Sequence, residues 1–184
     1  MLTKRKIRPW ESAIRQQAYD NARALAVAIV AGTAWMPPPY DLGIVLEPGE
    51  VVCHRCPATY RWRGAETWTV QHTSYRGRRS VARQVVAPYM YCLGTTDWVV
   101  TNRRLTTRAP DGQVISIYWA AVAGLTVDLA AEVVVLDGSH GYHGELSGPA
   151  IAPIAVAAIA CRHGLPGLVD HPALSALRSR VAAV

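Results

Sequence analysis

Phenylalanine is absent from this 184-residue chain, cysteine occurs only four times, and the only lysines are Lys4 and Lys6. Four cysteines are too few for a disulfide-stabilised scaffold, and nothing else indicates an oxidising compartment, so we expect a cytoplasmic protein. Nineteen Lys and Arg residues against thirteen Asp and Glu residues give a formal net charge of +6, nearly all of it from arginine. With 51% hydrophobic and 17% charged residues, the composition excludes a disordered or fibrous chain.

The chain also lacks a long hydrophobic run. The two apolar stretches, residues 24–36 and 149–161, are well short of the ~20 residues that a membrane-spanning helix needs. The first stretch follows a basic N-terminus, but Glu11, Asp20 and two arginines interrupt the pattern of a signal peptide. We therefore expect both stretches to be parts of buried helices.

The first helix is predicted over residues 10–34, where apolar side chains recur every three to four residues. Prolines at positions 37–39 end it and favour an extended spacer, because proline cannot continue a helix. The sequence thus predicts two units: residues 1–40, with the N-terminal helix and the proline-rich spacer, and residues 41–184, with the main body. We expect the apolar side of the helix to pack on the body. The alternative is that it contacts a second copy of the chain in a homo-oligomer.

From residue 50 the hydrophobic period changes from that of a helix to that of a strand. Even-numbered positions from 52 to 62 fall on one side of this strand, and Arg55, Arg61 and Arg63 fall on the other. This alternation predicts a half-buried strand that presents the three arginines to solvent.

A hairpin and a loop are predicted next. Gly64 predicts a turn at residues 63–65, and alternation between residues 67 and 72 predicts a second strand. Residues 75–83 are basic and contain glycine, which favours a long loop. Residues 85–91 fit a strand and a helical turn equally well, so the sequence leaves the conformation of residues 75–95 open.

The remaining segments predict short strands followed by helices. The strands fall at residues 98–101, 105–108, 114–119, 125–129, 132–137 and 142–146. Such spacing, with turns between, indicates an antiparallel sandwich or barrel. The apolar stripe from Ile151 to Ile159 predicts a helix that ends at Gly164, and a last short helix is predicted from Pro172. The fold class we expect is α+β, mainly β.

Three local sequences resemble bacterial proteins with a pleckstrin-homology-like (PH-like) domain, including uncharacterised actinobacterial ones. They are Leu46-Glu47-Pro48-Gly49-Glu50, the run from Trp98 to Leu105, and Leu146-Ser147-Gly148-Pro149. The resemblance covers residues 44–164 and rests on the order of elements, and it leaves a cellular and a phage origin open. It implies a PH-like antiparallel barrel or sandwich with a C-terminal plugging helix, and a non-catalytic binding or regulatory module. It transfers no binding residue, because bacterial members share no ligand motif.

Positive charge is concentrated in residues 54–108, which hold ten basic and two acidic residues. Guanidinium groups bind phosphate and carboxylate in bidentate fashion, so this excess predicts a surface that binds an anion or a partner. Its residues are Arg55, Arg61, Arg63, Arg76, Arg78, Arg79, Arg103 and Arg104. The alternative is an ordinary solvated sheet face. We expect the partner to be a protein. Anionic lipid and nucleic acid are the alternatives, and binding to lipid would place the chain at the periphery of a membrane.

No motif indicates a cofactor, a metal or a catalytic residue. Cys53 and Cys56 have the spacing of a metal or redox motif, but positions i and i+3 of a strand lie ~10 Å apart on opposite faces. The pair can meet only if Pro57 interrupts the strand. His140 and His143 fall in a glycine-rich turn without a third ligand at a convincing spacing. We therefore expect no enzyme; an enzyme built from distant loops remains the last alternative.

Overall fold

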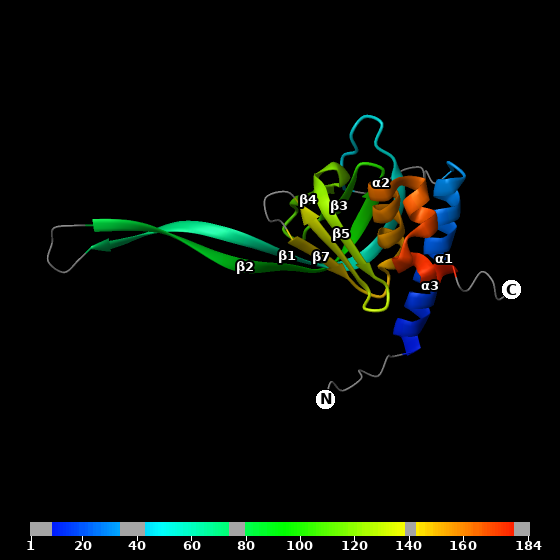
Figure 1. Cartoon of the computed structure of the whole chain (residues 1–184), viewed down its shortest axis with the longest axis horizontal. Helices are drawn as coiled ribbons and strands as arrows, with labels where there is room; N and C mark the ends of the chain where they lie inside the picture. The colour runs from blue at the N-terminus through cyan, green and yellow to red at the C-terminus, as the bar shows by residue number, and fades with distance from the viewer. Residues whose placement is uncertain (1–8, 34–42, 74–79, 139–142, 179–184) are drawn as a thin grey trace.

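The computed structural model describes residues 9–33, 43–73, 80–138 and 143–178, and in residues 64–73 and 80–90 it describes the backbone alone. The chain forms a seven-stranded antiparallel sheet, with one helix before it in sequence and helices after it (Figure 1). This arrangement confirms the α+β class, the N-terminal helix and the C-terminal helices. The sheet is not closed, since β4 and β5 form its two ends.

The strands run in the order β4-β3-β2-β1-β7-β6-β5 across the sheet. Their bounds are β1 Val52–Thr73, β2 Ser80–Thr101, β3 Arg104–Arg108, β4 Val114–Tyr118, β5 Val122–Asp128, β6 Val133–Gly138 and β7 His143–Ser147. β1 is central, because it pairs with β2 on one side and with β7 on the other. The short helix η1 (Trp119–Ala121) connects the two end strands, β4 and β5.

The predicted turn at residues 63–65 is wrong. Those residues lie inside β1, opposite residues 88–90 of β2, and the ladder between the two strands continues to Thr73 opposite Ser80. Cross-strand pairing therefore overrides the turn preference of Gly64. Residues 80–83, for which the sequence favours a loop, and residues 85–91, which the sequence left open, all belong to β2.

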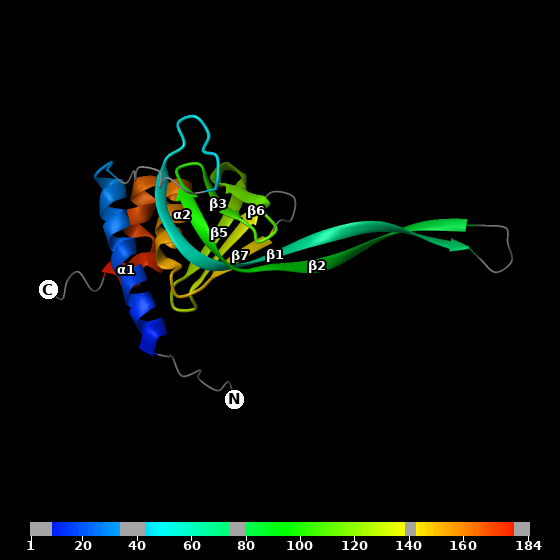
Figure 2. The same cartoon turned by 180° about the vertical axis from the view of Figure 1, so that it is seen from behind.

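The N-terminal helix packs on the body. α1 (Pro9–Val30) lies along α2 (Ala152–Asp170) on the side of α2 away from the strands (Figure 2). Ala18, Ala22 and Leu25 of α1 belong to the same buried cluster as the core of the sheet. An ion pair from Arg15 Nε to Glu132 Oε1 at 2.6 Å also joins α1 to the body.

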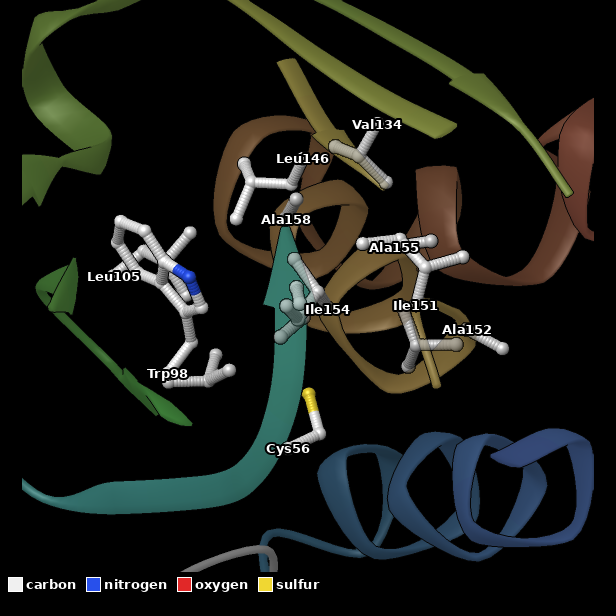
Figure 3. Close-up of a cluster of buried hydrophobic side chains, with 14 of the residues drawn as sticks. Cys56, Trp98, Leu105, Val134, Leu146, Ile151, Ala152, Ile154, Ala155 and Ala158 are labelled. Atoms are coloured by element: carbon white, nitrogen blue, oxygen red, sulfur yellow. The ribbon is translucent and has the colours of Figure 1, made fainter. Parts of the chain in front are cut away.

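The core lies between the sheet and the first half of α2. Residues 151–159 are all buried, and in Figure 3 Ile154, Ala155 and Ala158 of α2 face Trp98, Leu146 and Val134 of the strands. The small side chains of α2 allow this close approach, and each large apolar side chain buried here contributes ~1.5–3 kcal/mol.

The sequence predicts that the helix ends at Gly164, whereas the structure has a break at Gly164 within α2, which continues to Asp170. Gly164 has a φ of 69° and interrupts the helical conformation of α2, which resumes through Pro166. A left-handed φ suits glycine because it has no Cβ. η3 (Pro172–Leu174) and α3 (Ser175–Arg178) follow, and Leu174 and Leu177 of these short helices are buried.

Candidate binding surface

β1 and β2 continue beyond the rest of the sheet as a two-stranded arm (Figures 1 and 2). β7 pairs with β1 only over Thr59–Arg63, and β3 pairs with β2 only over Trp98–Val100. Beyond that, Gly64–Thr73 pairs with residues 80–89 and with no other strand that the structure describes. We call residues 64–73 and 80–89 the ribbon. Its ten residue pairs give it a reach of roughly 33 Å at about 3.3 Å per residue.

Both outer edges of the ribbon lack a neighbouring strand within the described parts of the chain. An unpaired edge presents a row of backbone N–H and C=O groups that water or a partner must satisfy. A two-stranded hairpin without a third layer is at best marginally stable in water. Among the described strands, the ribbon is therefore the part of the sheet with the least support from neighbouring strands.

Aromatic side chains anchor the ribbon where it leaves the body. Trp62 and Tyr91 are opposite each other in the register, and their ring centroids are 5.9 Å apart. Deeper in the sheet, Tyr60 packs edge-on against Trp98 with centroids 5.1 Å apart. Such cross-strand aromatic pairs fix the relative position of two strands. The base of the ribbon is thus more firmly held than its far end.

An apolar groove lies beside this base, at the opening between the end strands β4 and β5. It encloses a cavity of about 260 Å³ whose walls include Tyr60, Trp62, Ile115, Ile117 and Val122. No sequence pattern predicts this groove, because it exists only where the two end strands of the sheet do not pair with each other. The polar groups of the described side chains in its walls are the hydroxyls of Tyr60, Tyr118 and Ser116 and the indole N–H of Trp62, so the groove suits an apolar side chain rather than acid–base chemistry.

Three of the predicted surface arginines are engaged with carboxylates of the body. The pairs are Arg55 NH2 with Asp97 Oδ2 at 2.7 Å, Arg61 NH1 with Glu145 Oε1 at 3.7 Å, and Arg103 NH1 with Glu47 Oε2 at 3.4 Å. All three arginines are exposed, and pairs of this kind contribute ~0–1 kcal/mol. Such pairs can exchange with another anion at little cost.

Arg104 lies inside the protein rather than on a binding surface. Its Nε and NH2 groups both donate at 2.9 Å to the two carboxylate oxygens of Glu50, and the two residues are only 7% and 6% exposed. Burial alone would raise the pKa of Glu50, but hydrogen bonds from Arg104, from the backbone N–H of Glu47 and from Thr101 lower it overall. This cluster holds the segment before β1 against β3, so the charge of Arg104 is already neutralised.

Arg55, Arg61 and Arg63 are all exposed, as the alternation of β1 predicts. Arg63 stands at the base of the ribbon and forms no ion pair among the side chains that the structure describes. Arg76, Arg78 and Arg79 lie outside the described residues. The structure therefore brings Arg61 and Arg63 together at the ribbon base and leaves Arg55 and Arg103 on the body.

The cysteines have the properties of packing residues. Cys53 and Cys56 are both buried in β1, whose pairing with β2 shifts register between Val52 and His54, and burial raises the pKa of each thiol to about 12. Both thiols are therefore protonated near neutral pH, whereas nucleophiles and metal ligands are thiolates. Among the described residues no three His, Cys, Asp or Glu side chains are grouped as metal ligands would be.

His143 has a carboxylate partner of its own. Its Nδ1 lies 2.7 Å from Asp137 Oδ1, across the pairing of β6 with β7. His140 lies outside the described residues. Of the two histidines in the predicted turn, the structure therefore describes only His143, which contacts Asp137 on the neighbouring strand.

α2 is long and apolar enough, by length and composition, to cross a membrane. Half of its most apolar stretch is buried inside the protein. A helix at the core of a folded domain passes the same test, so this property is weak evidence for a membrane span.

Comparison with known proteins adds no relative. No protein-family model, no curated protein and no solved structure matches this chain.

Proposed function

We propose that this chain is a non-catalytic binding module of PH-like type that engages a protein partner or an anionic surface through the ribbon. The order of elements supports the PH-like part of the proposal. β1 to β4 follow one another across one half of the sheet, β5 to β7 return to β1, and α2 covers the core. This is the succession of strands and closing helix that the resemblance over residues 44–164 implies.

The ribbon is the single observation that carries the binding role. Ordering a residue costs about 1–2 kcal/mol of backbone entropy, and the ribbon has no sheet neighbour or helix among the described residues to offset that cost. A partner that binds the ordered ribbon stabilises it by mass action. An arm of this length, attached to a well-packed body, is suited to reaching a surface that the body itself does not touch.

The groove beside the ribbon does not favour an enzyme. Among the described residues, its walls bring no carboxylate, histidine or thiol together. The buried thiols lie elsewhere, on the side of β1 that faces the helices. The groove instead supports a binding role, because it lies where a partner held by the ribbon would meet the body.

The test compares the full chain with a ribbon-replaced variant, in which Asn-Gly takes the place of residues 64–89. Arg63 and Met90 are opposite each other in the register, so a two-residue Asn-Gly turn can join them. The pairing of Thr59–Arg63 with β7 is unchanged in this variant. Circular dichroism and thermal unfolding check that its body is folded.

Binding is measured to three probes: vesicles containing phosphatidylserine, double-stranded DNA, and poly-L-glutamate as a model of an acidic protein surface. We expect the full chain to bind at least one probe and the ribbon-replaced variant to bind it at least tenfold more weakly. Equal binding by the two proteins would contradict the proposal. Failure of the full chain to bind any of the three probes would contradict it as well.

A matched pair of variants separates charge from shape. One replaces Arg76, Arg78 and Arg79 with Gln, and the other replaces Arg108, Arg162 and Arg178 with Gln. The second set is exposed on the body and donates to backbone carbonyls, so it removes the same charge away from the ribbon. We expect only the first variant to weaken binding to the anionic probe.

A further inference from the structure

His171 joins three helical elements at the C-terminal end of the described chain. Its backbone N–H donates to Gly167 O at 2.8 Å, and its C=O accepts from Leu174 N at 3.0 Å and from Arg178 NH2 at 3.2 Å. Its ring Nδ1 accepts from the backbone N–H of Ala173 at 3.3 Å and thereby caps the start of η3. One residue therefore connects α2, η3 and α3.

The cap of η3 requires the neutral form of this imidazole. A backbone N–H can only donate, so the ring nitrogen that faces Ala173 must offer a lone pair. An imidazolium ion carries a proton on both ring nitrogens and cannot accept. Protonation of His171 would therefore replace the hydrogen bond with two N–H donors that face each other.

Two basic side chains lie beside His171 and disfavour its protonation further. The rings of His163 and His171 have centroids 5.5 Å apart, and Arg178 reaches the C=O of His171 from α3. A Cβ at Gly167 would overlap that of His163, so the backbone after the break at Gly164 is tightly folded and keeps the two rings together. Burial, His163 and Arg178 all lower the pKa of His171 from its ordinary value of 6.5.

The acidic residues of the neighbouring helices do not counter this effect. Asp20 of α1 is paired with Arg23 NH1 at 2.8 Å, and Arg23 Nε donates to Leu177 O at 2.9 Å. Asp170, the last residue of α2, is exposed, so solvent screens its charge. Neither carboxylate therefore stabilises the imidazolium form of His171.

We propose that His171 is a pH-sensitive latch, which holds η3 and α3 against α1 and α2 near neutral pH and releases them in mild acid. The inference goes beyond the proposed function, because α3 lies on the side of the body opposite the arm (Figures 1 and 2). Pro172–Arg178 is a short segment near the end of the chain, and such segments open at a low cost in free energy. The loss of one cap and the gain of one charge are enough to shift its equilibrium.

Release of this segment uncovers apolar surface. Leu174 and Leu177 are buried in the latched protein. A groove of about 400 Å³ between α1 and α2 has Val27, Leu168 and Arg178 in its walls, so it loses one wall when α3 moves away. Mild acid should therefore increase the exposed apolar surface on the helical side of the body.

The direction of the pH effect follows from the lowered pKa. A histidine whose pKa is lower in the folded than in the unfolded state stabilises the folded form fully above pH 6.5. This contribution is lost as the pH falls through the lower, folded-state value. The latch is therefore closed at pH 7.5 and weakened at pH 5.

Amide exchange measured by NMR on the full chain at pH 7.5 and pH 5 tests the latch. The amides of Ala173, Leu174 and Ser175 report on η3, and those of Val99 and Val100 in β2 are the reference. Protection factors are compared, because they correct for the intrinsic pH dependence of exchange. We expect protection in η3 to fall about fivefold relative to the reference in acid, as the loss of one helix cap implies.

Two substitutions at position 171 separate protonation from packing. His171→Asn retains a side-chain acceptor at the cap without a titrating group, so its protection factors should be equal at the two pH values. His171→Ala removes the acceptor and should give low protection at both. His163→Gln removes one neighbouring charge, so the NMR titration midpoint of His171 should rise toward 6.5.

The reference amides account for other groups that titrate. Burial also lowers the pKa of His54 in β1, so acid can weaken the whole fold, but that effect is common to η3 and the reference. The inference is wrong if His171 titrates at or above pH 6.5, if protection in η3 is equal at the two pH values, or if His171→Asn loses as much protection in acid as the original chain. Because the Asn variant keeps the cap, a folding defect of the Ala variant cannot decide the result.

Discussion

At the scale of single residues, the pair of Glu50 and Arg104 shows how a charged side chain can belong to the core. Strand alternation correctly predicts that Arg55, Arg61 and Arg63 are exposed, because alternation is a local property. It gives no indication that Arg104 is buried. The carboxylate that compensates its charge lies 54 positions away in the sequence, so only the paired strands bring the two together.

Replacement of Glu50 by Gln tests this pair. It leaves the buried guanidinium of Arg104 without a carboxylate, which should lower the free energy of unfolding by about 3–5 kcal/mol at pH 7. Urea unfolding of both proteins measures the difference. Glu47, which is only partly buried and pairs with the exposed Arg103, provides the control: Glu47→Gln should cost less than about 1 kcal/mol.

The same pair gives a pH dependence of known sign. The pKa of Glu50 is lowered from its ordinary value of 4.5, so its contribution to stability is present above pH 4.5 and is lost as the pH falls through the lower, folded-state value. The difference between the original chain and Glu50→Gln should therefore be constant from pH 7 to pH 5 and shrink at lower pH. A difference that grows on acidification would contradict this account of the pair.

The cysteines allow a second prediction at this scale. Cys53 and Cys56 are buried, and burial raises the pKa of each thiol to about 12. Cys92 and Cys161 are both exposed at the surface, but desolvation by the surrounding protein raises the pKa of Cys161 to about 11. At pH 8 a disulfide reagent should react promptly with Cys92 alone, because the other thiols are almost entirely protonated. In 8 M urea all four should react. Prompt reaction of Cys53 or Cys56 in the folded protein would show that β1 is less well covered by α1 and α2 than described.

At the scale of secondary-structure elements, the sequence predicts the ends of most strands well. The prediction is wrong where a strand is held by residues that are distant in the sequence. The strands from β3 to β7 fall close to the predicted ranges, because turns such as Pro110-Asp111-Gly112 separate them clearly. The continuous β1 was missed. Gly64 is a local turn signal, but the residues that keep it extended belong to β2 and occur some 25 positions later.

The packing of α1 can be tested at Ala22, which is completely buried in the core cluster. Ala22→Leu inserts a larger side chain at the contact of α1 with the body and should lower the free energy of unfolding by about 1–3 kcal/mol. Ala13→Leu, on the exposed side of the same helix, should change it by less than about 0.5 kcal/mol. Equal effects in urea unfolding would mean that α1 is not part of the body's core.

The ribbon should be the least protected part of the sheet in hydrogen exchange. Its backbone bonds are made between two strands alone, whereas residues 54–63 of β1 lie within a wider sheet and against helices. We expect amides of residues 64–73 to exchange within seconds, orders of magnitude faster than those of residues 54–63. Equal protection of the two segments in the free protein would contradict the description of an unsupported arm.

At the scale of the whole molecule, a well-packed body carries a two-stranded arm whose described positions, 64–73 and 80–89, hold one arginine and one glutamate. The sequence shows that arginine is concentrated in the middle third of the chain. It does not show that arginines of the body such as Arg55 and Arg61 form ion pairs with Asp97 and Glu145. The division between body and arm becomes visible only once the register of β1 with β2 is known.

This division predicts that the body folds without the arm. The core cluster of the described side chains is formed by the body, and the strand and helix contacts that surround α2 come from the body. The ribbon-replaced variant should therefore unfold cooperatively, with a midpoint within about 5 °C of the full chain, because the loss of a marginally stable hairpin removes little free energy. Differential scanning calorimetry measures both midpoints. A variant that fails to fold, or that melts much earlier, would mean that the arm stabilises the body, and the ribbon would then be a structural element instead of one kept for contact with a partner.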